Sequence, residues 1–152
     1  MSMIIRAITK EDVHSCIALG QEMHNESAYN AISFDSDSLV GVAYNVLNDP
    51  NWFGAVAVKE DQVIGMMVGF ISEYWFSNEK FAADLCVYIV PEYRGSSAAL
   101  RLMNLYTKWA VSKPIREIRI GETTRVNPEA TAKFYKKLGF VEGGTLFVRP
   151  VH

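Results

Sequence analysis

Residues 87–99 of this chain read VYIVPEYRGSSAA. An apolar, β-branched run stops at Pro91, and a short turn of small residues leads into apolar positions with helical spacing, namely Ala99, Leu102, Met103, Tyr106, Trp109 and Ala110. This spacing predicts a buried strand, a turn and then a helix of about 17 residues. Because the first amides of a helix have no partner within it and the helix dipole is positive there, we interpret the turn as a cradle for a pyrophosphate.

The segments on either side of this stretch predict a mixed α+β order of elements. Before it, the patterns indicate a strand over 3–8, helices over 10–27 and 35–48, a hairpin of strands 53–58 and 63–71 turning at 60–62, and a strand over 81–90. After it, they indicate a strand over 115–120, a helix opening at Asn127-Pro128 and ending at Gly139, and short strands over 140–141 and 146–148. A meander joined to strand–helix–strand crossovers implies an α/β protein with a mixed sheet.

The bulk properties are those of an ordinary globular protein. With 152 residues, of which 49% are apolar and 21% charged, the chain is expected to form one domain over 1–152. A net charge of -2, without a Lys/Arg run, argues against nucleic acid as the partner. No signal-peptide core or membrane-length apolar run is found, so we expect a cytoplasmic protein without a membrane partner. Cys16 and Cys86 lie in apolar patterns, which favours free thiols over a disulfide or metal site.

Two motifs, taken together, point to a family. The first is RGSSAA at 94–99, where Ser97 stands at a position that usually carries glycine in the pattern Gln/Arg-x-x-Gly-x-Gly/Ala. The second comprises Asn127, Phe134-Tyr135, Leu138 and Gly139-Phe140. In this order and at this separation they resemble the GCN5-related N-acetyltransferases (the GNAT family), over nearly the whole chain. The resemblance implies a central mixed sheet, splayed between its fourth strand (81–90) and its fifth (115–121) and flanked by about four helices.

The resemblance also implies acetyl-CoA (coenzyme A) as the cofactor. The pantetheine arm would lie in the splayed gap along Val87, Tyr88 and Ile89, with Asn127 also in contact with it. The pyrophosphate would lie on the loop and helix start formed by Arg94, Gly95, Ser96, Ser97, Ala98, Ala99 and Leu100.

Three residues are candidates for the chemistry. Tyr135 matches the family tyrosine near the thioester sulfur, and a phenol is protonated at neutral pH and ready to act as a general acid. It could equally be a core aromatic residue. Glu122, at the end of the strand before Asn127, is the first candidate for the base, and Asp84 is the second. Asp84 lies within an apolar strand, where a buried carboxylate needs a hydrogen-bonding partner or a shifted pKa, so a structural role is the other interpretation.

The function implied by the resemblance is transfer of an acetyl group from acetyl-CoA to a primary amine, directly and in a ternary complex. The alternative, favoured by Ser97, is a catalytically weak or inactive binding module that acts through a protein partner. The acceptor could be a small molecule or a protein amine, and acidic and aromatic residues in segments flanking the acceptor side would suit a cation, namely Glu26, Tyr29, Phe34, Glu73 and Glu79. The aromatic run at 74–76 is a core or interface patch, or a wall of the acceptor pocket. A homodimer through that run or through the last strands is a further hypothesis, and no metal site is expected.

Overall fold

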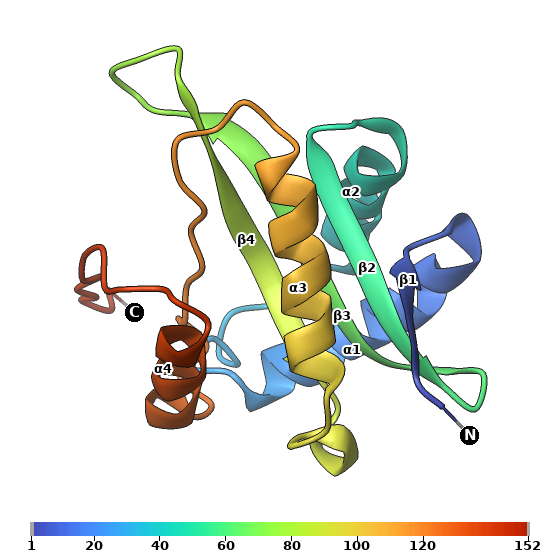
Figure 1. Cartoon of the computed structure of the whole chain (residues 1–152). Helices are drawn as coiled ribbons and strands as arrows, with labels where there is room; N and C mark the ends of the chain where they lie inside the picture. The colour runs from blue at the N-terminus through green and yellow to red at the C-terminus, as the bar shows by residue number, and fades with distance from the viewer. Residues whose placement is uncertain (1, 152) are drawn as a thin grey trace.

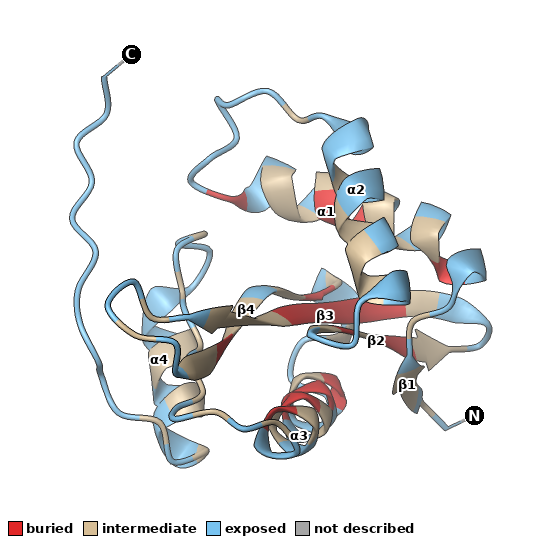
Figure 2. Ribbon diagram, turned by 90° about the horizontal axis from the view of Figure 1, so that it is seen from above, coloured by how far each residue is buried: buried red, intermediate tan, exposed pale blue. Residues whose placement is uncertain are grey.

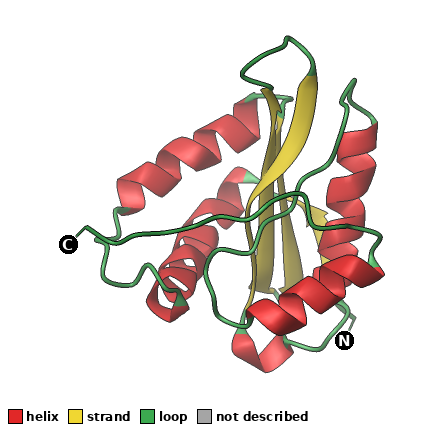
Figure 3. Ribbon diagram, turned by 90° about the vertical axis from the view of Figure 1, so that its left-hand side faces the viewer, coloured by secondary structure: helices red, strands yellow, loops and turns green. Residues whose placement is uncertain are grey.

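The computed structural model describes residues 2–151 and has a central antiparallel sheet with helices on both faces (Figures 1 and 3). The strands are β1 (Ile4–Ala7), β2 (Trp52–Lys59), β3 (Gln62–Glu73) and β4 (Lys80–Ile89), in that spatial order. Helices α1 (Val13–Glu26) and α2 (Ser36–Asn48) cover one face, α3 (Ala98–Val111) covers the other, and α4 (Pro128–Lys137) lies at the β4 side (Figure 2). Among residues 2–151, no helix is both long and apolar enough to cross a bilayer.

The predicted hairpin is present as β2 and β3. The two connecting residues, Glu60 and Asp61, have φ values of 51° and 61°, so the turn is the left-handed two-residue type that matches the twist of antiparallel strands. Both strands are almost continuously apolar because both faces of the sheet are covered by helices, and Val56 and Met67 are completely buried. The hairpin forms the middle of the sheet and carries most of its buried residues.

Helix α3 packs on the sheet through the apolar stripe that its sequence predicts. It runs for 14 residues, slightly less than expected, and its buried face includes Leu102, Met103 and Tyr106. Tyr106 approaches the sheet at Gly69, where an added Cβ would lie 2.6 Å from the tyrosine ring. The close approach explains the glycine in a central strand, because any side chain there would displace α3.

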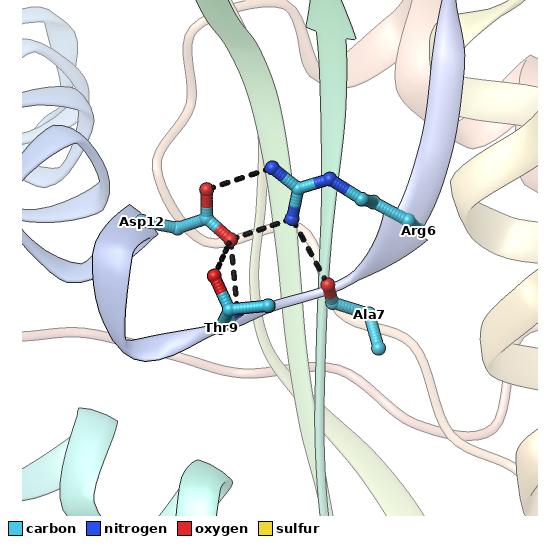
Figure 4. Close-up of polar contacts among 4 residues, drawn as sticks. All are labelled: Arg6, Ala7, Thr9 and Asp12. Atoms are coloured by element: carbon cyan, nitrogen blue, oxygen red, sulfur yellow. Dashed lines mark hydrogen bonds and ion pairs between the residues drawn. The ribbon is translucent and has the colours of Figure 1, made fainter.

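An ion pair between the half-exposed Arg6 and the buried Asp12 joins β1 to the start of α1 (Figure 4). The guanidinium of Arg6 donates to both carboxylate oxygens of Asp12, at 2.7 and 2.9 Å, and the amide and hydroxyl of Thr9 donate to the same carboxylate at 2.8 and 3.0 Å. The Arg6 hydrogen bonds, with those from Thr9, lower the pKa of Asp12 to about 2 despite its burial. The contact sets the angle at which the first helix leaves the sheet.

The strand predicted over 115–120 is reduced to a short contact. This segment runs parallel to the start of β4 with one bridge, Ala82 to Ile118, and hydrogen bonds from Arg116 to Lys80, from Ala82 to Glu117 and from Arg119 to Ala82 at 2.7–3.0 Å. The sheet is therefore mixed at this edge, but pairing stops before a regular ladder forms. The 115–121 segment leaves β4 where the chain turns toward α4 (Figure 1).

The prediction of short strands over 140–141 and 146–148 is wrong. Residues 140–151 are extended but form no ladder within the described chain, and Val141 and Phe147 are 87% and 89% exposed. Runs of two or three residues around Gly143-Gly144 need an existing strand edge to pair with, and the irregular 115–121 segment offers none. Helix α4 does end at Gly139 as predicted, with φ at +93°.

Candidate active site

The sheet opens at Asp84. Beyond Ala82, main-chain pairing with the 115–121 segment ceases, and the next link is a side-chain one, in which the Asp84 carboxylate accepts the amide of Gly121 at 2.9 Å. From that point the chains diverge and enclose a groove of about 550 Å³. The groove is lined by Asp84, Leu85, Cys86, Val87, Tyr88, Ile89, Arg94, Gly121, Glu122, Thr123, Thr124, Val126, Asn127, Thr131, Tyr135 and Met23. The gap predicted between the two segments is present.

A β-bulge in β4 lies at the mouth of this gap. Gly69 of β3 is opposite Asp84 and Val68 is opposite Cys86, so Leu85 has no partner on β3. A bulge bends its strand and increases the local twist, so the rest of β4 stays paired with β3 but turns away from the 115–121 segment. The bulge is therefore the local cause of the divergence, and nothing in the alternation of this apolar run signals it.

The loop before α3 presents free main-chain donors. Gly95 has φ at +88°, a left-handed conformation that favours glycine. The amide of Ser96 donates to the carbonyl of Tyr93 and that of Ala98 donates to the Ser96 hydroxyl, both at 3.2 Å. Within the described chain, no hydrogen-bond partner remains for four other amides, those of Gly95, Ser97, Ala99 and Leu100. These donors lie at the positive end of the α3 dipole, as an anion site requires.

Glu26 at the end of α1 connects this loop to β4. Its carboxylate accepts the Arg94 guanidinium at 2.7 Å and the Tyr88 hydroxyl at 3.0 Å, while Arg94 Nε donates to the Ile89 carbonyl at 2.9 Å. Burial, and then the hydrogen bond to Glu26, raise the pKa of Tyr88 to about 12. The Tyr88 hydroxyl is therefore held by Glu26 of α1. The sequence placed Glu26 on the side of a cationic acceptor, and in the structure its carboxylate instead pairs with the guanidinium of Arg94.

Asp84 and Glu122 differ in their surroundings although both line the groove. Burial raises the pKa of Asp84 to about 6, against the opposing effect of the Gly121 amide. Glu122 Oε1 accepts the amide of Arg125 at 2.7 Å and the Thr124 hydroxyl at 3.1 Å, so this carboxylate organises its own turn. That turn includes the left-handed Arg125, with φ at 61°.

Tyr135 reaches the groove from α4, and its neighbour Phe134 packs in the core beneath α3. The Tyr135 hydroxyl donates to the Gly121 carbonyl at 3.3 Å. Burial, and then the charge of Asp84, raise the pKa of this phenol well above its ordinary value, so it stays protonated. Asn127 begins the same helix, and its side-chain oxygen accepts the amide of Ala130 at 3.3 Å.

Other residues considered from the sequence lie elsewhere. Glu79 forms an ion pair with Arg116 at 3.7 Å. Trp75, 94% exposed, lies in the loop between β3 and β4, at the end of β4 far from the loop that precedes α3 (Figure 1). The 74–76 run therefore lines neither the groove nor a core. Tyr29 and Phe34 instead line a second, apolar cavity between the first two helices and the sheet, which no sequence pattern indicated.

Comparisons with known proteins agree with this architecture. The acetyltransferase (GNAT) family model matches residues 11–140. Among solved structures, the chain is similar to the acetyltransferase AAC(6′)-Iy in complex with a bisubstrate analogue, CoA-S-monomethyl-acetylneamine (TM-score 0.81, 15% identity, covering 100% of this chain and 99% of that one). It is also similar to a transcriptional regulator from Bacillus halodurans C-125 (0.78, 18%, 98% and 99%) and to an acetyltransferase from Trypanosoma brucei (0.74, 16%, 99% and 100%). A search of curated proteins found no match.

Identities this low show a shared fold alone, whereas the family model spans most of the chain. The matched span contains both the splayed sheet and the donor-rich loop before α3. The chain therefore belongs to the GNAT family of acetyltransferases.

Proposed function

We propose that this protein transfers an acetyl group from acetyl-CoA to a primary amine, by direct transfer in a ternary complex. The observation that carries the proposal is the continuity of the groove. It runs along the edge of β4 from Arg94, which directly precedes the loop with the free amides, to Asp84 and Tyr135, which both line it and both bond to Gly121. Similar structures are described as N-acetyltransferases, one of them in complex with CoA.

The residues present fit the cofactor. The free amides of Gly95, Ser97, Ala99 and Leu100 would hold the pyrophosphate, since nothing else in the described chain satisfies them. The outer edge of β4 at Val87, Tyr88 and Ile89 has no neighbouring strand within the described chain, although the Ile89 carbonyl accepts Arg94 Nε. With Asn127, which lines the same groove, this edge would hold the pantetheine arm as an added strand. When bound, acetyl-CoA supplies the thioester carbonyl that an amine can attack.

The chain's own residues would handle the protons. Asp84, with a pKa of about 6, is largely ionised at neutral pH and basic enough to take a proton from the ammonium group of an acceptor, directly or through water. Tyr135 Oη, which stays protonated, would donate its hydrogen bond to the departing sulfur. Glu122 would position the turn at 122–125 and thus the rim of the groove. We therefore assign the base to Asp84 rather than to Glu122.

Direct transfer is favoured over a covalent acetyl-cysteine. Burial raises the pKa of the Cys86 thiol to about 12 and that of the Cys16 thiol to about 11. Only a thiolate is an effective nucleophile. Of the two cysteines, the charge of Arg6 acts on Cys16 alone, and Cys16 does not line the groove. Cys86 would act as a small apolar wall.

The backbone of the loop gives the binding-module alternative no further support. Ser97 has φ at −77°, a conformation open to any residue, so serine at this position causes no backbone strain. The loop residue that needs glycine is Gly95, and glycine is present there.

Two serine-to-aspartate variants at opposite ends of α3 test the proposal. Ser97→Asp places a carboxylate at the helix start, which favours the helix but repels a pyrophosphate, so acetyl-CoA affinity should fall by about tenfold or more while the Tm is kept. Ser112→Asp, at the other end of the helix, is the matched control and should leave affinity unchanged. Isothermal titration calorimetry gives both affinities, and thiol release in the presence of mixed primary amines gives turnover. Absence of binding to the unmodified protein at millimolar acetyl-CoA would overturn the proposal.

A further inference from the structure

A second cavity, of about 400 Å³, lies between the α1–α2 layer and the sheet. Its walls are formed mainly by apolar side chains from both helices and three strands, including Ile17, Phe34, Leu39, Val46, Met66 and Leu85. Among the described residues that line it, there is no aspartate, glutamate, lysine or arginine. A cavity of this size and character is typical of a site for the body of a small organic molecule.

This cavity adjoins the groove. Five residues line both, namely Met23, Leu85, Cys86, Thr123 and Thr124. The shared wall includes the bulge residue next to Asp84, so the cavity opens where the proposed base lies. A hydrogen bond at 2.7 Å from the amide of Ala28 to the carbonyl of Thr124 joins the segment after α1 to the shared wall of the cavity and the groove.

His24 is the polar exception within the cavity. Both ring nitrogens are buried, and neither has a hydrogen-bond partner. The ring lies against Phe34 with 5.5 Å between the ring centres. An imidazole always carries at least one N–H donor, and a buried polar group left without a partner costs about 1–3 kcal/mol. Such a group is explained if an occupant of the cavity supplies the missing partner.

We propose that this cavity binds the body of the acceptor, and that the acceptor is a monoamine with an apolar or aromatic body carrying one hydrogen-bonding group for His24. The inference rests on the proposed acetyl transfer and adds the substrate class. A polyamine or amino sugar would bring extra ammonium groups into a cavity with no carboxylate among its described walls, and burying an unpaired charge is strongly unfavourable. The single amine of the proposed acceptor would extend toward Asp84 in the adjoining groove.

Three commercially available amines test the class. Tyramine offers an aromatic body with a hydroxyl, phenethylamine lacks the hydroxyl, and spermidine is a polycation. At saturating acetyl-CoA, we expect kcat/KM for tyramine to exceed that for spermidine by about tenfold or more. The kcat/KM for tyramine should exceed that for phenethylamine by about three- to tenfold, which corresponds to the contribution of one hydrogen bond.

Variants then tie the preference to the cavity. His24→Phe keeps an aromatic ring against Phe34 but removes both nitrogens, so the tyramine-to-phenethylamine ratio should fall to about one. Ala43→Leu fills the cavity from α2 and should raise KM for both aromatic amines. Val40→Leu, on the same helix but exposed and outside the cavity, is the control and should change neither.

The outcomes separate this inference from the proposed function. If the enzyme acetylates spermidine as well as or better than tyramine, the inference is overturned and acetyl transfer stands. If Ala43→Leu leaves the KM of both aromatic amines unchanged while they remain substrates, their bodies bind elsewhere and the inference is again overturned. If tyramine binds by calorimetry, and binds more weakly to the Ala43→Leu variant, but no acetyl group is transferred, the cavity assignment is supported and the proposed function fails.

Discussion

Replacing Asp84 by asparagine should make the protein more stable and less active at the same time. In the folded chain, burial raises the pKa of this carboxyl from 3.8 to about 6. Asparagine has the same shape, and its side-chain oxygen can still accept the amide of Gly121. The substitution therefore removes a buried charge and keeps the hydrogen bond that links β4 to the 115–121 segment.

The expected size of the effect follows from the pKa difference. Each pKa unit corresponds to about 1.4 kcal/mol, so the ionised Asp84 destabilises the fold by up to roughly 3 kcal/mol, and about 2 kcal/mol once its partial exposure is considered. Because the folded pKa is raised, the folded state holds the proton more tightly than the unfolded state between about pH 4 and pH 6. The wild-type protein thus loses stability as pH rises through this window, and the asparagine variant does not.

Urea denaturation at pH 8 and at pH 4 measures the effect. At pH 8, Asp84→Asn should raise the free energy of unfolding by about 2 kcal/mol, or the Tm by roughly 4–8 °C, and at pH 4 the difference should nearly vanish. Asp61→Asn, the same chemical change in the exposed β2–β3 turn, should shift stability by less than about 0.5 kcal/mol at either pH. A destabilised Asp84→Asn variant, equally so at both pH values, would refute the reasoning.

The same variant tests catalysis. Loss of a general base lowers kcat/KM by about 10²–10⁴-fold, and the wild-type pH profile should fall below about pH 6, where Asp84 becomes protonated. In Asp84→Asn the residual rate should lose that acidic limb. Glu122→Gln should keep the limb, because the glutamine oxygen can still accept the amide of Arg125. A limb that survives in Asp84→Asn would assign the base elsewhere.

Three further changes have defined outcomes. Tyr135→Phe should lower kcat about ten- to a hundredfold with acetyl-CoA affinity held within about twofold by calorimetry, and unchanged turnover would remove the acid role. Arg6→Met leaves Asp12 buried without its cation and should destabilise the protein by about 2–3 kcal/mol at pH 7 in urea melts. Since the pKa of Asp12 is lowered to about 2, this loss should shrink only as pH falls from about 4 toward 2, and a pH-independent loss would contradict the ion-pair account. Gly95→Ala places a Cβ on a residue with φ at +88°, so it should lower the free energy of unfolding by about 1–2 kcal/mol and weaken acetyl-CoA binding. An unchanged Tm would contradict the expected backbone strain.

The features predicted correctly from the sequence are those encoded locally. The helical spacing of Leu102, Met103 and Tyr106 reports one buried face, and the Asn127-Pro128 start and Gly139 end of α4 follow from capping chemistry. Strand 115–120 and the terminal strands were overestimated, because an alternating pattern measures the tendency to pair and not the presence of a partner edge.

The two carboxylates near the gap show the same limit at the site. Both Asp84 and Glu122 were candidates from the sequence, but the sequence could not decide which is the better candidate base. A general base needs a suitable pKa, and burial and neighbouring groups set the pKa of a carboxylate. The fold gives Glu122 two local donors and gives Asp84 a buried position with one. Glu26 was read as a group for a cationic acceptor, and its pairing with Arg94 joins residues 68 positions apart.

By itself, the sequence determined the α/β order of elements and the donor-rich turn before α3, since each depends on residues close together in the chain. It also determined the family, since that depends on the order and spacing of motifs along the chain. The tertiary structure alone decided where β4 parts from the 115–121 segment and which carboxylate has a raised pKa. It alone also decided that an apolar cavity containing an unpartnered His24 opens beside that carboxylate. These features arise from contacts between segments distant in the sequence. Their energies depend on which segments shield a polar group from water, and no local sequence pattern records that shielding.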